Sequence, residues 1–199
     1  MNYYKSSKKS YETDEEIKEL ALSYLDKYQP SKKDLRLYLF RKVLSDDQGS
    51  ANKSIILEQI DKVINNLEHL GLINDDLYSE MKSKNFLKRG YSLNKIKMTL
   101  SQKGIDSELL KRTIENIKND NEDPDFYSAI KICKRRRIGP YRPDANKEMF
   151  LKKDIGVLAR AGFSYETSME VLNIDKKELK ILEKKLYFFI FFIFLFFFY

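Results

Sequence analysis

The 199-residue sequence contains one cysteine, Cys133, and one histidine, His69. A single cysteine excludes a disulfide framework, and one Cys with one His cannot supply the ligands of a structural zinc site. Cys133 falls on the apolar face of a predicted helix, which favours a buried thiol over a reactive one. His69 lies in the last turn of another predicted helix, where the helix dipole favours an imidazole, so we expect a structural role. We therefore expect no metal and no cofactor.

Glycine and proline are also scarce, with seven and four residues. So few residues of these types cannot easily supply the many turns of a β-sandwich or a β-barrel. The chain has no GxGxxG, GxxxxGK[ST], GxSxG or HExxH motif, so the usual signatures of phosphate binding, nucleophilic catalysis and catalytic zinc are missing. We expect an all-helical protein that is not an enzyme.

Charge is abundant, with 37 Lys and Arg against 30 Asp and Glu and a net charge of +7. Charged residues make up 34% of the chain and the mean hydropathy is −0.54, which is typical of a soluble protein. The first residues lack the apolar core and the cleavage site of a secretory signal peptide. A cytoplasmic location is therefore expected, with residues 1–12 as a flexible N-terminus.

The last 14 residues, 186–199, carry no charge and include eight of the 13 phenylalanines. As a helix they would span about 21 Å, less than the roughly 30 Å hydrocarbon core of a bilayer. A longer helix that began at Leu179 would place Glu183, Lys184 and Lys185 inside the apolar layer. We therefore favour a low-complexity extension that packs on the body or promotes aggregation over a membrane anchor.

From Thr13 onward the sequence reads as a series of capped amphipathic helices. Predicted starts are Thr13-x-x-Glu16, Ser31-x-x-Asp34, Asn74 to Asp76, Asp106 and Asp123-Pro124. Predicted stops are Gly71, Gly90, Gly104 and Gly139-Pro140. The apolar faces are expected to include Tyr28, Leu70, Leu77, Tyr78 and Met81.

One pattern recurs at an offset of 58 residues. The two copies read Ile96-x3-Leu100-x3-Gly104-Ile105-Asp106-x-Glu108 and Asp154-x3-Leu158-x3-Gly162-Phe163-Ser164-x-Glu166. Each copy indicates a helix, a glycine cap and a second capped helix. We predict three tandem three-helix repeats over 13–73, 74–120 and 121–174, followed by a C-terminal helix and the apolar tail over 175–199. Such repeats contact mainly their neighbours, so an elongated, curved molecule with a concave face for a partner is expected.

A basic cluster is the strongest candidate for a partner-binding site. Its residues are Lys134, Arg135, Arg136, Arg137, Arg142, Lys152, Lys153 and Arg160. One interpretation is a solvated helix C-terminus, to which each cation contributes about 0.3 to 1 kcal/mol. The other is a contact surface for a phosphate backbone or an acidic protein face, because Arg can bind two oxygens at once. No interleaved aromatic residues accompany the cluster, so recognition of single-stranded bases is not supported.

The chain resembles the bacterial RecX regulatory proteins from about Tyr24 to Ile174. The resemblance rests on Ser31-x-x-Asp34-Leu35-x3-Leu39, Leu70-Gly71-Leu72-Ile73-Asn74-Asp75, Ile96-x3-Leu100-x2-Lys103-Gly104-Ile105, Lys134-Arg135-Arg136-Arg137-Ile138-Gly139-Pro140 and Ala159-Arg160-Ala161-Gly162-Phe163-Ser164. The last two stretches look like the proteobacterial branch. The chain departs from the family pattern at Ser79, where many members have Ala, and in its Phe-rich tail.

The resemblance implies an all-α fold of three-helix repeats, no catalysis and no small-molecule substrate. It also implies binding in the groove of the RecA filament on single-stranded DNA, which would modulate recombination and repair, with inhibition as the expected net effect. The alternative is a non-catalytic DNA-binding helical module that uses Arg135 to Arg137, and a weaker alternative is a tail-anchored membrane protein. A weak direct contact with DNA is compatible with the first two interpretations.

Overall fold

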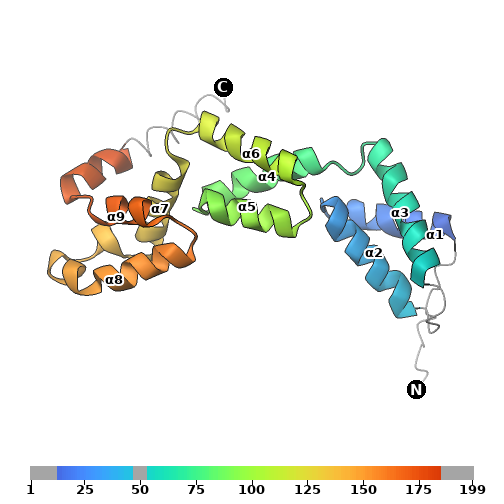
Figure 1. Ribbon diagram of the computed structural model, residues 1–199, viewed down its shortest axis with the longest axis horizontal. Helices are drawn as coiled ribbons and strands as arrows, with labels where there is room; N and C mark the ends of the chain where they lie inside the picture. The colour runs from blue at the N-terminus through green and yellow to red at the C-terminus, as the bar shows by residue number, and fades with distance from the viewer. Residues whose placement is uncertain (1–12, 47–52, 185–199) are drawn as a thin grey trace, which may run out of the picture. The chain divides into compact units, whose positions relative to one another are not determined.

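The computed structural model describes residues 13–46 and 53–184, and all regular secondary structure in them is helical (Figure 1). The helices are α1 (Asp14–Leu25), α2 (Lys32–Asp46), α3 (Lys53–His69), α4 (Asp75–Lys88), α5 (Leu93–Gln102), α6 (Ser107–Asp120), α7 (Pro124–Arg136), the 3-10 helix η2 (Gly139–Tyr141), α8 (Asp144–Arg160) and α9 (Tyr165–Leu172). A further helical stretch covers 176–184. The predicted all-α fold class is confirmed. The expectations about the flexible N-terminus and the apolar tail concern residues outside the described part.

The helices begin where capping side chains predict. The Thr13 hydroxyl accepts a hydrogen bond from the Glu16 N–H at 3.3 Å, and the Glu16 carboxylate accepts one from the Thr13 N–H at 3.1 Å. Asp123 caps α7 by accepting from the Phe126 N–H at 3.0 Å, with Pro124 at the first helical position. Such caps satisfy N–H groups that have no partner inside the helix.

Predicted glycine stops are confirmed at Gly71, Gly90 and Gly104, whose φ angles are +70°, +80° and +86°. The end of α7 differs from the prediction, because this helix ends at Arg136 and not at Gly139-Pro140. Arg137 takes the left-handed cap position itself, with φ +54°. The N–H of Gly139 donates to Asp154 at 3.0 Å, so Gly139 opens η2 and does not end α7.

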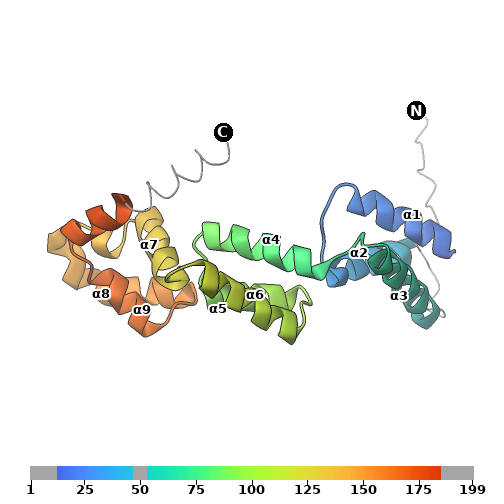
Figure 2. The same cartoon turned by 90° about the horizontal axis from the view of Figure 1, so that it is seen from above.

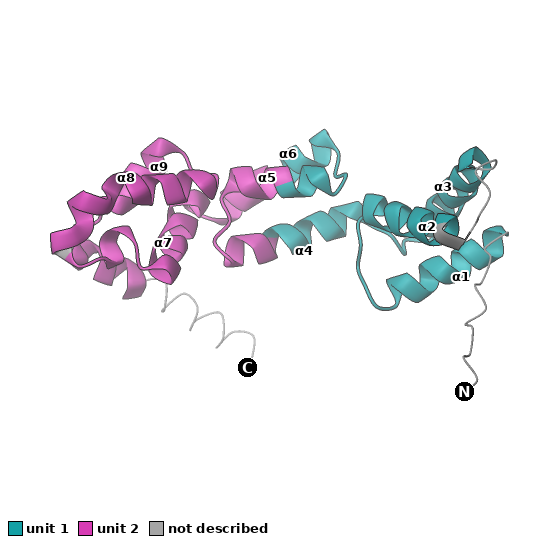
Figure 3. Ribbon diagram, turned by 90° about the horizontal axis from the view of Figure 1, so that it is seen from below, with its two compact units in different colours: residues 1–83, 99–113 teal, residues 84–98, 114–199 magenta. Residues whose placement is uncertain are grey.

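The chain forms two compact units, shown in different colours in Figure 3. Unit 1 comprises residues 1–83 and 99–113, and unit 2 comprises residues 84–98 and 114–199. The boundary passes through α4, α5 and α6, so each of these helices contributes to both units. The limits of the three repeats and the elongated, curved shape remain predictions from the sequence pattern.

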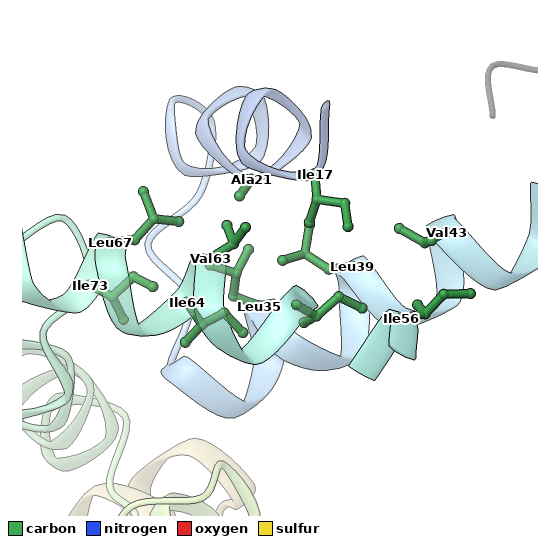
Figure 4. Packing of buried hydrophobic residues seen from close by; sticks show 11 residues of the cluster. Ile17, Ala21, Leu35, Leu39, Val43, Ile56, Val63, Ile64, Leu67 and Ile73 are labelled. Carbon is green, nitrogen blue, oxygen red and sulfur yellow. The ribbon is translucent and has the colours of Figure 1, made fainter. Parts of the chain in front are cut away.

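The core of unit 1 lies where α1 covers α2 and α3. Ile17 and Ala21 point from α1 toward the other two helices, as Figure 4 shows, and both are fully buried. The remaining buried members are Leu35, Leu39, Val43, Ile56, Ile60, Val63, Ile64, Leu67 and Ile73. Each buried Leu, Ile or Val side chain stabilises the fold by about 1.5 to 3 kcal/mol relative to its exposed state.

The core of unit 2 is formed by α7, η2, α8, α9 and the stretch 176–184 (Figure 2). Its buried members are Ala129, Ile130, Ile132, Cys133, Ile138, Leu158, Phe163, Val171, Leu172, Ile174 and Leu179. Cys133 is fully buried, and burial raises the pKa of its thiol to about 12. The prediction that this thiol is buried is therefore confirmed.

The buried face of α4 agrees with the prediction in part. Tyr78 is buried and Met81 is half-buried, as predicted, whereas Leu77 is 52% exposed. Ser79 and Ser83, which the prediction did not include, are also buried, and the Thr113 hydroxyl of α6 lies 3.4 Å from the Ser79 hydroxyl. A search for apolar residues at helical spacing could not find a face built from serines.

Two further apolar residues are exposed against expectation. Tyr28 is 57% exposed and Leu70 is 59% exposed. Both follow the last residue of their helix, because α1 ends at Leu25 and α3 ends at His69. The helical periodicity that placed them inward no longer applies beyond those ends.

Candidate functional site

The N-terminus of α2 is joined to the chain around α4 and α5 by a set of polar contacts within unit 1. The Ser31 hydroxyl donates to the Lys103 carbonyl at 2.7 Å and accepts from the Asp34 N–H at 3.2 Å. The Lys32 N–H donates to the Asp75 carboxylate at 2.9 Å. One serine thus caps its own helix and binds the end of another. We call this set joint 1.

The same arrangement recurs in unit 2 at the N-terminus of α5. The Ser92 hydroxyl donates to the Ala161 carbonyl at 2.9 Å and accepts from the Lys95 N–H at 3.1 Å. The Leu93 N–H donates to the Asp125 carboxylate at 2.7 Å. We call this set joint 2. The two joints account for the repeated sequence pattern, because Lys103 and Ala161, at equivalent positions of the two copies, both accept a hydrogen bond from a capping serine.

Each joint also includes a glycine that another residue approaches closely. A Cβ added to Gly104 would lie 2.7 Å from the Lys33 Cβ, and a Cβ added to Gly162 would lie 2.6 Å from the Ser92 hydroxyl.

Burial raises the pKa of the Asp75 and Asp125 carboxyls, although each accepts a backbone hydrogen bond that acts in the opposite direction.

Two cations of the predicted basic cluster have partners inside unit 2. Lys134 Nζ lies 2.8 Å from a Glu183 carboxylate oxygen. Arg135 Nη1 donates to the Arg89 carbonyl at 3.1 Å, at the end of α4. These two residues therefore help to hold α7 against its neighbours.

Arg142 has a structural role in unit 2. Its guanidinium binds both carboxylate oxygens of Asp154, at 2.7 and 2.8 Å, and stacks 4.5 Å from the centre of the Phe150 ring. Burial acts to raise the pKa of Asp154, but the hydrogen bonds from Arg142 and from the Gly139 N–H outweigh it, so the pKa is lowered. Arg142 is thus set apart from the exposed members of the cluster.

The other cluster members are exposed. Arg136, Arg137, Lys152 and Arg160 form no ion pair with any residue that the structure describes. The Lys153 ammonium lies 5.7 Å from the centre of the Phe150 ring. The structure therefore divides the predicted site into an anchored group and an exposed group.

Cationic charge is concentrated in unit 2. Its described residues include 20 Lys and Arg against 13 Asp and Glu, a net charge of +7, whereas those of unit 1 include 13 against 15, a net charge of −2. Within the described residues, the ion pairs of unit 1 include Lys32–Glu68, Arg36–Asp61, Lys62–Asp14, Lys103–Asp34 and Arg112–Asp76. Those of unit 2 include Lys134–Glu183 and Arg142–Asp154. Of the described residues, those of unit 2 therefore have the charge that favours a polyanion.

Sequence reasoning missed a cationic stretch of unit 2 and a buried carboxylate. The segment 84–98 contains five Lys and Arg and no acidic residue, a signal that a search for consecutive cations overlooks. The role of Asp154 was also missed. The repeat aligns Asp154 with Ile96, which is fully buried. A carboxylate at such a buried position needs a cationic partner, and this requirement was the signal that could have identified Arg142.

Unit 1 has an apolar groove of about 400 Å³ between the end of α1 and the start of α4. Its lining includes Tyr28, Leu72 and Leu77, which are 57%, 51% and 52% exposed. Asp26 is the one carboxylate among the lining residues that the structure describes.

Among residues 13–46 and 53–184, no three His, Cys, Asp or Glu side chains are placed to hold a metal ion. No helix in the same part of the chain is long and apolar enough to span a bilayer.

The sequence is similar to curated proteins named regulatory protein RecX. The match to the protein of Myxococcus xanthus is 28% identical over 160 residues and covers 79% of this chain and 84% of that one. A protein of Clostridium perfringens is 28% identical over 156 residues, with 78% and 66% covered. A protein of Corynebacterium efficiens is 32% identical over 116 residues, with 56% and 54% covered. No family model matches the chain.

Solved structures show the same fold. A crystal structure of regulatory protein RecX has a TM-score of 0.57 at 18% identity and covers 81% of this chain and 72% of that one. RecX from Lactobacillus salivarius has a TM-score of 0.55 at 21% identity, with 80% and 94% covered. The resemblance inferred from sequence motifs is confirmed, and so is the helical repeat fold.

Proposed function

We propose that this chain, as a protein of the RecX type, binds the filament that RecA forms on single-stranded DNA and inhibits its activity. The similarity to proteins named regulatory protein RecX, in sequence and in fold, is the observation that carries the proposal. The binding is stoichiometric and involves no chemical step and no small-molecule substrate. The process affected is recombination and DNA repair.

The charge distribution supports unit 2 as the part that approaches the nucleic acid. A filament of recombinase on DNA presents phosphates, and the described residues of unit 2 carry a net charge of +7. The exposed cluster members are the contact residues of the proposal. They are Arg136, Arg137, Lys152, Lys153 and Arg160.

Unit 1 fits the protein component of the filament better than its DNA. Its described residues carry a net charge of −2, which does not attract phosphates, while its groove exposes apolar side chains that a protein surface can cover. We expect Leu77→Asp to reduce inhibition of RecA and to leave affinity for bare DNA unchanged. Equal inhibition by Leu77→Asp and by the parent chain would exclude the groove from the interface.

The alternative function is that of a non-catalytic DNA-binding module that uses Arg135 to Arg137. The charge of unit 2 also favours this function, whereas the similarity to regulatory proteins favours the first. The two differ in their target. The alternative predicts tight binding to bare duplex DNA that weakens steeply with salt, and no dependence of that binding on RecA.

Titration of the 199-residue chain into RecA on single-stranded DNA tests the proposal. ATP hydrolysis and filament length are followed together, the second by electron microscopy. We expect hydrolysis to fall and filaments to shorten, with saturation at a fixed ratio of chain to RecA. Unchanged hydrolysis and filament length at a molar excess of the chain would contradict the proposed function.

A further inference from the structure

The end of α4 packs directly on α7 within unit 2. A Cβ added to Gly90, the residue that follows Arg89, would lie 3.1 Å from the Ser128 carbonyl. Lys131 Nζ donates to the Leu87 carbonyl at 3.5 Å, and Arg135 Nη1 donates to the Arg89 carbonyl at 3.1 Å. The cationic end of α4 is therefore held beside the cationic half of α7.

The start of α5 is held against the end of α8 in the same unit. Joint 2 supplies the contact between the Ser92 hydroxyl and the Ala161 carbonyl, and Asn94 Nδ2 donates to the Gly162 carbonyl at 3.4 Å. Arg160 immediately precedes these carbonyls. The short segment 90–94 thus joins the end of α4 to the end of α8. Helix α7 contacts the chain just before this segment, through the bond from Arg135 to the Arg89 carbonyl, and within it, through the bond from the Leu93 N–H to Asp125.

The cations at the end of α4 are not needed to stabilise that helix end. Lys and Arg at a helix C-terminus normally interact with the last carbonyls. Here Lys131 and Arg135 of α7 already donate to those carbonyls, and the segment 84–98 has no acidic residue to pair with Lys88 or Arg89. Both side chains are exposed and form no ion pair within the described residues.

We propose that Lys88 and Arg89 belong, with Arg136, Arg137 and Arg160, to one surface that binds the phosphate backbone of nucleic acid. We call these five residues the cationic rim. The inference rests on the proposed function for the presence of nucleic acid, and it adds Lys88 and Arg89 to the contact residues and direct binding to bare nucleic acid without a protein subunit. Joint 2 and Arg135 hold the ends of α4, α7 and α8 together, and each of these ends carries exposed cations. Such a surface matches a phosphate backbone, which has a negative charge at every nucleotide.

The experiment measures binding of the 199-residue chain to bare fluorescent oligonucleotides, one single-stranded oligo-dT and one duplex, without RecA. The test variant is Lys88→Glu with Arg89→Glu. The matched control is Lys27→Glu with Lys111→Glu, two exposed cations of unit 1 that change the net charge equally. Fluorescence anisotropy across a salt series gives affinity and salt slope, and circular dichroism checks that both variants are folded.

We expect the rim variant to bind either probe about tenfold or more weakly at low salt and the control to bind like the parent. The slope of the logarithm of the binding constant against the logarithm of the salt concentration should decrease in magnitude by about 0.7 per lost phosphate contact on single strands, or about 0.9 on duplex. Equal affinity of the rim variant and the parent overturns the inference. So does equal weakening in the control, which would indicate net charge alone, or displacement of DNA by polyglutamate at equal charge, which would indicate an acidic protein partner.

A chain that binds neither probe also overturns the inference, while the proposed function survives if the same chain still shortens RecA filaments. Conversely, binding to both probes through the rim without any effect on RecA supports the inference and removes the proposed function. Preference for one probe over the other supports phosphate binding and identifies which form of nucleic acid supplies it.

Discussion

Substituting alanine at three glycines separates the cost of backbone strain from the cost of crowding at the two joints. Gly71, Gly104 and Gly162 all have positive φ, at +70°, +86° and +91°, so each alanine variant loses about 1 to 2 kcal/mol from the left-handed conformation. A Cβ at Gly71 would meet nothing within 4 Å. Gly71→Ala is therefore the matched control, because it carries the backbone strain alone.

Gly104→Ala adds a collision to the strain. The new Cβ would lie 2.7 Å from the Lys33 Cβ, an atom fixed to the backbone of α2, so the contact at joint 1 must open. Overpacking of this kind costs about 1 to 3 kcal/mol, which gives a total loss of about 2 to 5 kcal/mol. Gly162→Ala should resemble Gly104→Ala, because its Cβ would lie 2.6 Å from the Ser92 hydroxyl.

Urea unfolding followed by circular dichroism measures these losses as shifts of the midpoint at constant slope. The free energy of unfolding should fall more for Gly104→Ala and Gly162→Ala than for Gly71→Ala. Equal losses in all three variants would show that close approach at the joints has no energetic role, and the argument for two equivalent joints would fail.

Three further outcomes follow from the buried polar and ionisable groups. Arg142→Met leaves the Asp154 carboxylate buried without its cation and should lower the free energy of unfolding by about 3 to 5 kcal/mol, and adding Asp154→Asn should recover part of the loss in melting temperature. Burial raises the pKa of Asp75 and Asp125 above their ordinary 3.8, so the native state binds these protons more readily than the unfolded state. The free energy of unfolding of the parent should therefore fall relative to Asp75→Asn or Asp125→Asn as pH rises from about 3.8 through the raised pKa, and the opposite slope would refute the assignment. The thiol of Cys133 should react with a thiol reagent only after denaturant unfolds unit 2, and labelling of the native chain would contradict its burial.

Helix starts and most helix ends were predictable because their signals are local. A capping side chain such as Thr13 or Asp123 lies within three residues of the N–H that it satisfies, and a glycine such as Gly104 marks a conformation that other residues avoid. The end of α7 was not predictable in this way. There the left-handed position is taken by Arg137, a residue type that rarely adopts positive φ, and Gly139 instead donates its N–H to Asp154, 15 residues further along the chain.

The candidate site was predictable in part for the same reason. Consecutive cations at 134–137 are visible in the sequence, but which of them are exposed depends on distant partners such as Glu183 and the Arg89 carbonyl. Arg142 was grouped with them because its binding to Asp154 leaves no local pattern. On α4 the inward position of Tyr78 was predicted correctly, but the buried Ser79 and Ser83 were missed because helical periodicity counts only apolar side chains.

The most direct test of the account is binding of Arg136→Glu with Arg137→Glu to RecA-coated single-stranded DNA. Both residues lie at an exposed helix C-terminus, where each charge reversal costs on the order of 1 kcal/mol through the helix dipole, so the variant should stay folded with only a slightly lower melting temperature. Co-sedimentation with filaments should show much weaker binding at low salt, and the difference from the parent should shrink as salt rises. If the double variant binds and inhibits RecA filaments as well as the parent at low salt, the cluster is a solvated helix end and the proposed interface is wrong.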